Sequence, residues 1–95
     1  MYLENGVIVT ITDGVHRKVE AYDLLQLLNE LRAAGAEAIA INEQRVVYST
    51  YIVDIRNANT YIRVNGEKVA SPYIIKAIGD PTYLESGLSQ KGVRI

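Results

Sequence analysis

The sequence predicts a single α+β domain of two layers, in which a mixed sheet of four or five strands carries one main amphipathic helix on one face. Three observations predict this class. A β-branched run lies near the start, a leucine-striped segment follows it, and a short apolar run comes directly after a glycine. Strand, helix and strand in this order make a crossover unit with parallel strands. A chain of 95 residues has room for one such core.

The first half of the chain supplies the β-α-β start. We expect residues 1–5 to be disordered and the domain to occupy 6–95. Val7–Thr12 is β-branched and has strand length, and Asp13-Gly14 is a turn pair. A helix is predicted over 21–34, because leucines recur at the helical period and a glycine follows as the expected stop; they are Leu24, Leu27, Leu28 and Leu31, with Gly35 after them. No Ser, Thr or Asn marks its start.

The middle of the chain reads as strands and turns. Residues 37–42 are predicted to form a strand parallel to Val7–Thr12, and residues 42–45 a turn into an antiparallel strand at 46–50. Residues 52–55 are apolar enough to continue the pairing. A strand is expected at 60–64, and Asn65-Gly66 is the strongest hairpin signal in the chain, returning at 67–69.

Two short helices are predicted at the C-terminal end. Ser71-Pro72 has the pattern of an N-cap followed by proline at the first helical position, which predicts a helix over 73–78 that ends at Gly79. Asp80-Pro81 repeats the signal before a second helix over 82–88.

Composition excludes several classes of function. The net charge of −1 argues against a general attraction to nucleic acid. Without cysteine the chain has no disulfide or thiolate site, and its one histidine, His16, excludes the common histidine-rich zinc sites. No phosphate loop or nucleophile elbow is present. We therefore expect neither enzyme activity nor a cofactor or metal. No apolar run reaches membrane-spanning length, which predicts a soluble domain.

Two sets of residues are candidates for binding. The polar set is Asn42, Gln44, Arg45, Lys76 and Asp80. Arg45 and Lys76 could form a small site for an anion or a peptide end. Turn and cap roles, with a solvated Lys76, explain most of the same pattern. The aromatic set is Tyr48, Tyr51, Tyr61 and Tyr73, from a chain with seven tyrosines and no other aromatic residue than histidine. These tyrosines either line the margin of a small core, which we favour, or form an interaction surface.

The strings LLNELRAAGAEAIAINEQRV and SPYIIKAIGDP, with the Asn65-Gly66 hairpin, resemble a bacterial family of unknown function, number 881, whose members are sometimes labelled division initiation proteins. The resemblance runs from about Gly6 to Gly92. It implies a membrane-anchored protein with a coiled coil and with this domain on the outer side of the membrane, near cell-division and envelope proteins. It also implies a further helix and strand after Gly92, so we expect a domain truncated at its C-terminal end and a homodimer or strand-exchanged assembly.

Three classes of function follow. The first, favoured by the resemblance, is a non-catalytic interaction or scaffolding domain for envelope or division proteins. The second is a small-ligand or peptide-binding domain that uses Arg45 and Lys76. The third, an enzyme, is the least supported, because no general base, nucleophile or metal set assembles from these residues.

Overall fold

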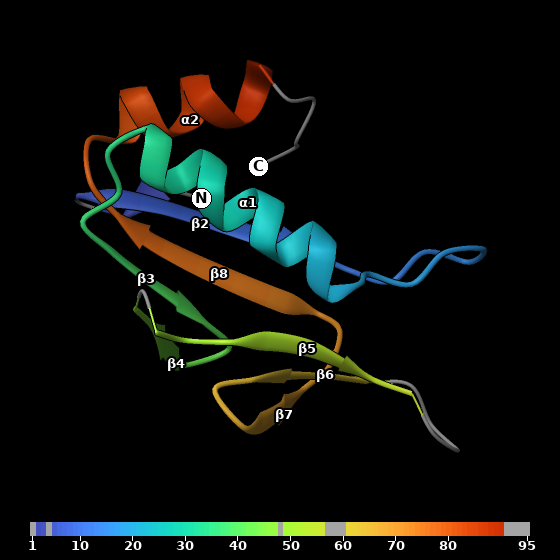
Figure 1. Cartoon of the computed structure of the whole chain (residues 1–95). Coiled ribbons are helices and arrows are strands. Elements are labelled where there is room, and N and C mark those ends of the chain that lie inside the picture. The colour runs from blue at the N-terminus through green and yellow to red at the C-terminus, as the bar shows by residue number, and fades with distance from the viewer. Residues whose placement is uncertain (1, 4, 48, 57–60, 91–95) are drawn as a thin grey trace.

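The computed structural model describes residues 2–3, 5–47, 49–56 and 61–90 (Figure 1). In chain order the elements are β1 (Tyr2–Leu3), β2 (Gly6–Ile11), α1 (Ala21–Ala33), β3 (Ala38–Ile41), β4 (Gln44–Val46), β5 (Ile52–Ile55), β6 (Tyr61–Val64), β7 (Glu67–Val69), β8 (Tyr73–Ile78) and α2 (Pro81–Gln90). They confirm an α+β domain. Tyr2 and Leu3, which were expected to be disordered, pair with Val7 and Gly6 of β2.

The strands form two sheets, where the sequence predicted one. Five strands pair in the order β1-β2-β8-β3-β4, and three pair in the order β5-β6-β7. Each pairing in both sheets is antiparallel. β2 and β3 do run in the same direction, as expected of a crossover unit. They are not neighbours, however, because β8 lies between them and pairs with both. The unit is therefore a split β-α-β.

β8 is the main correction to the predicted elements, since residues 73–78 were expected to be helical. Tyr73, Ile75 and Ala77 are buried, whereas the residues between them are exposed. This period of two is that of a strand. Ser71 does not cap a helix, because its hydroxyl accepts a hydrogen bond from the backbone N–H of Asp13 (2.9 Å). The second predicted helix is confirmed as α2.

Two tight turns fix the hairpins. Asn42 and Glu43 have φ values of 46° and 71°, and Ile41 pairs with Gln44 across them. Positive φ at both central residues is the backbone of a two-residue type I′ hairpin. The turn is thus shorter than the predicted 42–45, and β4 begins two residues before the predicted strand. The Asn65-Gly66 turn between β6 and β7 is confirmed, with φ values of 54° and 86°.

α1 and α2 lie on the same side of the five-stranded sheet (Figure 1). The predicted leucine stripe of α1 is buried there against β2 and β8, and Leu84 and Leu88 bring α2 into the same core. The three-stranded sheet lies on the opposite side of the molecule from α2, and its inward residues join that core. They are Ile52, Ile62, Val64 and Val69.

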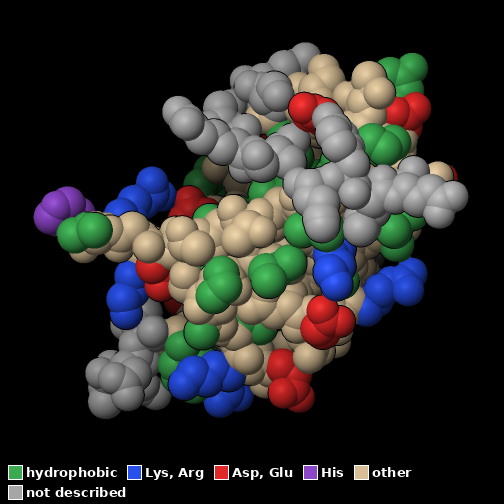
Figure 2. Space-filling view, turned by 180° about the vertical axis from the view of Figure 1, so that it is seen from behind, with side chains coloured by type: hydrophobic (Ala, Val, Ile, Leu, Met, Phe, Trp, Pro, Cys, Tyr) green, Lys and Arg blue, Asp and Glu red, His purple; other side chains and the backbone are tan. Residues whose placement is uncertain are grey.

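The other face of the five-stranded sheet has no helix over it among the described residues. Seen from behind, its middle shows hydrophobic side chains among backbone and uncharged polar side chains, with charged side chains around them (Figure 2). Ile74 and Ile78 of β8 lie on this face and are 38% and 39% exposed. Within the described part of the chain, no helix is long and apolar enough to cross a lipid bilayer.

Candidate functional site

Asn42 holds the β3–β4 turn against the start of β8. Its side-chain oxygen accepts a hydrogen bond from Ile74 N–H (2.7 Å), and its amide group donates to the carbonyls of Ala70 (3.2 Å) and Pro72 (3.4 Å). These bonds use both ends of the amide. Asn42 therefore occupies the turn by its positive φ, as the turn role considered from sequence requires, and its side chain also joins the turn to residues 70–74.

The structure does not bring Arg45 and Lys76 into a common cavity. Both are paired in register with Ala40, one from each side, so they lie on the outer face of the sheet with β3 between them. Strand spacing puts their backbones about 10 Å apart. Lys76 forms an exposed ion pair with Glu43 (3.3 Å). A cleft of about 330 Å³ reaches Arg45 but does not include Lys76.

The other two polar candidates, Gln44 and Asp80, lie at the ends of secondary-structure elements. Gln44 begins β4 opposite Ile41 and is half-buried at the sheet edge. Asp80 caps α2: its carboxylate accepts a hydrogen bond from Thr82 N–H (2.9 Å), and its carbonyl accepts one from Leu84 N–H (3.0 Å). An aspartate at this position satisfies backbone donors that the helix leaves unpaired.

The candidate tyrosines divide between core and surface. Tyr73 is 4% exposed and belongs to the core, so it cannot contribute to an interaction surface. Tyr51 is 55% exposed and Tyr61 is half-buried, and both belong to the three-stranded part of the fold. Tyr48 lies outside the described residues. The four tyrosines that were grouped in the sequence analysis therefore do not form one patch.

The outer face of β5–β7 is the strongest candidate for a functional surface. Side chains alternate along each strand, and the register pairs Val53 with Arg63, Arg63 with Lys68, and Ile55 with Tyr61. We use the name tyrosine–basic face for the residues that share this outward side: Tyr51, Val53, Ile55, Tyr61, Arg63 and Lys68. The face combines two tyrosines, two aliphatic residues and two cations.

Both cations of this face contact Tyr61. The Lys68 ammonium lies 4.8 Å from the centroid of its ring, and the Arg63 guanidinium lies 5.6 Å from it. Arg63 also donates a hydrogen bond to the Tyr61 hydroxyl (3.2 Å). Contacts of this kind between a cation and a ring are favourable and keep both cations near the aromatic side chain.

Sequence reasoning included Tyr51 and Tyr61 but missed Arg63 and Lys68. The signal was present, because a two-residue turn at Asn65-Gly66 requires Val64 to face Glu67 and Arg63 to face Lys68.

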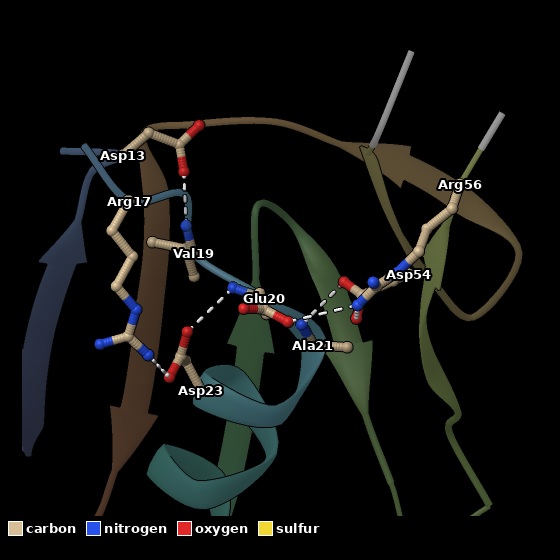
Figure 3. A network of polar contacts seen from close by, with 8 residues as sticks. All are labelled: Asp13, Arg17, Val19, Glu20, Ala21, Asp23, Asp54 and Arg56. Atoms are coloured by element: carbon tan, nitrogen blue, oxygen red, sulfur yellow. Dashed lines mark hydrogen bonds and ion pairs between the residues drawn. The ribbon is translucent and has the colours of Figure 1, made fainter. Parts of the chain in front are cut away.

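A network of polar contacts joins the start of α1 to β5 (Figure 3). Asp54 accepts a hydrogen bond from Ala21 N–H (3.0 Å), so a side chain of β5 satisfies a backbone donor at the start of α1. Asp23 accepts one from Glu20 N–H (2.9 Å). Arg56 contacts the carboxylates of Glu20 (3.3 Å) and Asp54 (3.6 Å). These contacts explain how α1 begins without the usual capping residue, and they fix β5 beside it.

The loop before α1 is held by the same network. The Asp13 carboxylate accepts a hydrogen bond from Val19 N–H (2.7 Å), and Arg17 pairs with Asp23 (3.0 Å). Between this loop and α1 lies an open cleft of about 500 Å³, with Leu27 in its lining. Most ionic groups around the network are solvent-exposed, and pairs of this kind contribute little to stability.

Among the described residues no cluster of three His, Asp or Glu side chains could hold a metal ion.

Burial raises the pKa of the Tyr73 phenol above its ordinary value, and the nearby carboxylates of Asp13 and Asp54 raise it further. Both causes disfavour the phenolate. In the unfolded chain, Tyr73 has an ordinary pKa of about 10. As the pH rises above that value, the unfolded state loses this proton before the folded state does. The free energy of unfolding must then fall.

We expect the Tyr73→Phe variant to lose part of the alkaline sensitivity of the wild type. Urea unfolding between pH 8.5 and 10.5 measures this, with a slope from one group of at most about 1.4 kcal/mol per pH unit. The matched control is Tyr83→Phe, because Tyr83 is 68% exposed; this variant should keep the wild-type slope. An identical slope in Tyr73→Phe and wild type would contradict the prediction.

Comparison with known proteins gives one consistent result. Residues 4–94 match the family described as bacterial protein of unknown function (DUF881). The chain is 39% identical over 94 residues to the UPF0749 protein Rv1825 of Mycobacterium tuberculosis, covering 92% of this chain and 30% of that protein. It is 32% identical over 96 residues to the UPF0749 protein YlxW of Bacillus subtilis, covering 92% and 40%.

A solved structure has the same fold. The crystal structure of an uncharacterized conserved protein from Mycobacterium tuberculosis superimposes with a TM-score of 0.77 and 32% sequence identity, covering 94% of this chain and 63% of that one. The chain thus spans 30–40% of the length of these two curated relatives. None of these descriptions assigns a catalytic activity.

Proposed function

The chain belongs to the bacterial DUF881 family of unknown function, and from this premise we propose that it is a non-catalytic protein-interaction domain. The observation that carries the proposal is the tyrosine–basic face. Tyrosine and arginine are enriched in protein interfaces, where tyrosine supplies a large contact area with few rotatable bonds. Tyr51 and Val53 are exposed there, 55% and 37% respectively, although both have large apolar surfaces.

The arrangement of the face supports binding better than catalysis. Its groups are aromatic, aliphatic and cationic, and a cation beside a phenol offers no nucleophile with a base. The carboxylates of Asp54 and Glu20 are used in the network at the start of α1, and Glu67 points to the other side of the three-stranded sheet. The five-stranded sheet and the two helices provide a rigid body that presents the face.

We further propose that the whole protein is a membrane-anchored scaffold of the bacterial cell envelope or of cell division, with this domain on the outer side of the membrane. The family resemblance supports this placement. The chain spans 30–40% of the length of two relatives, so the remaining length of such proteins can accommodate an anchor and a coiled coil.

The test is site-specific photocrosslinking in cells that produce the full-length protein. A benzophenone amino acid replaces Val53 in one variant and Tyr83 in the control, because Tyr83 is an exposed residue of α2, far from this face. We expect position 53, and not position 83, to crosslink to one envelope or division protein that mass spectrometry identifies. Crosslinks that are equal at both positions, or none at position 53, would refute the proposal.

A further inference from the structure

We propose that the tyrosine–basic face binds an extended, acidic segment of its protein partner, with carboxylates at Arg63 and Lys68 and an apolar side chain over β5. This inference rests on the proposed function and adds the chemistry of the partner. It depends on the charges of Arg63 and Lys68, on their spacing, and on the aromatic and aliphatic residues beside them.

The two cations face one another without an acid between them. Arg63 and Lys68 are directly opposite in the β6–β7 register, and both are exposed. Like charges in such a pair destabilise a hairpin. Within the described residues, neither forms an ion pair, and the contacts that place them are with Tyr61. The adjacent acid, Glu67, pairs with Val64 and so points to the other side of the sheet.

A carboxylate bound between these cations would remove their repulsion and form charge-assisted hydrogen bonds. Arg63 presents a planar group suited to a carboxylate, and Lys68 adds a second positive charge. Three other cations of the described residues have acidic partners: Arg17 contacts Asp23, Arg56 contacts Glu20, and Lys76 contacts Glu43. Arg63 and Lys68 therefore offer an anion a site that involves no competition with an internal acid of the described residues.

The apolar half of the face sets the spacing of the ligand. Val53 belongs to the same row as Arg63 and Lys68, two strands away from Lys68. That separation is about 10 Å, which three residues of extended chain span. Tyr51, directly before β5, and Ile55, at its end, flank Val53. The structure thus favours a segment with one or two acids and a large apolar residue about three positions away.

Charge decides against two other occupants. A second copy would bring the same two cations to the interface, where they would repel. Each basic residue near the surface of an anionic membrane raises the affinity of a protein for that membrane about fivefold. Two such residues give about 25-fold, which is too little for this face by itself to hold the domain on a bilayer.

The experiment measures fluorescence anisotropy of labelled octapeptides with the 95-residue chain at low salt. The probes are GEEGSLVG and its lysine counterpart GKKGSLVG. We expect the wild type to bind the glutamate peptide at least about tenfold more tightly, since each charge-assisted hydrogen bond contributes about that factor. The R63E/K68E variant should reverse this preference.

The matched control is R45E/K76E, which makes the same change of charge on the five-stranded sheet and should keep the wild-type preference. If circular dichroism shows that R63E/K68E does not fold, R63Q/K68Q is measured in its place. This variant should show no preference between the two peptides. An unchanged preference in R63E/K68E, or loss of preference in the control, would overturn the proposal. So would binding of the wild type to phosphatidylglycerol vesicles without binding of the glutamate peptide.

The photocrosslink at position 53 separates this inference from the proposed function. If R63E/K68E leaves that crosslink intact in cells, the face binds a protein by other means, so the acidic segment is wrong and the interaction domain stands. If the wild type gives no crosslink there, the interaction domain itself is wrong.

Discussion

Replacing Gly6 with alanine should destabilise the domain by about 3 kcal/mol or more. Gly6 is buried at the start of β2, where it pairs with Leu3 on one side and Ile78 on the other. A Cβ atom at this position would overlap the carbonyl oxygen of Ala77 and lie 3.1 Å from the Cα of Ile78. Both atoms belong to the backbone of the central strand, so no side-chain rotation can relieve the clash.

The matched control for Gly6 is Gly35→Ala. Gly35 follows α1 with φ at +93°, and a Cβ there would have no neighbour within 4 Å. Its replacement should cost only the backbone penalty of about 1–2 kcal/mol. Urea unfolding followed by circular dichroism measures both variants. If Gly6→Ala were as stable as Gly35→Ala, the close approach of β2 and β8 would be wrong.

The elements that could be predicted from the sequence are those whose determinants are local. α1 follows from four leucines at the helical period and a glycine after them, and its length is correct to one residue. The β6–β7 hairpin follows from Asn65-Gly66, because the required positive φ values restrict that turn to few residue types. In both cases the chemistry that decides the structure lies within a few residues along the chain.

β8 could not be recognised in the same way. Ser71-Pro72 and Asp80-Pro81 are nearly the same signal, yet the first precedes a strand and the second a helix. What distinguishes them is distant in sequence. β8 has β2 on one side and β3 on the other, so its backbone groups bond to segments that a local pattern does not reveal. The insertion of β8 also separated the two strands that were expected to be neighbours.

The candidate site shows the same division between local and distant information. Asp80 bonds to backbone two residues away, as the cap role considered from sequence describes, whereas the side chain of Asn42 bonds to backbone of residues 70–74, which the sequence did not reveal. The alternative, a common anion or peptide-end site formed by Arg45 and Lys76, depended on the arrangement of three strands, and β3 lies between the two residues. Tyr73 was one of four tyrosines considered for the margin of the core or for an interaction surface. In a strand, the alternation that buries Ile75 buries Tyr73 as well.

The central position of β8 leads to the second large expected effect. Ile75→Ala should reduce the free energy of unfolding by about 2–5 kcal/mol, the range for removing a buried isoleucine side chain. Ile75 is fully buried and pairs with Val9 on one side and Ile41 on the other, both fully buried themselves. A cavity there is bordered by three strands and by the helical layer, so little collapse can relieve it.

The neighbouring residue supplies the control. Ile74 has the same side chain and is 38% exposed on the opposite face of the sheet, so Ile74→Ala should cost less than about 1.5 kcal/mol. Residues 74, 75 and 78 would share one face of a helix, because they follow the helical period. The ratio of the two losses therefore distinguishes strand from helix. Similar losses for Ile74→Ala and Ile75→Ala in urea unfolding would contradict the two-residue alternation of β8, and with it the strand order of the five-stranded sheet.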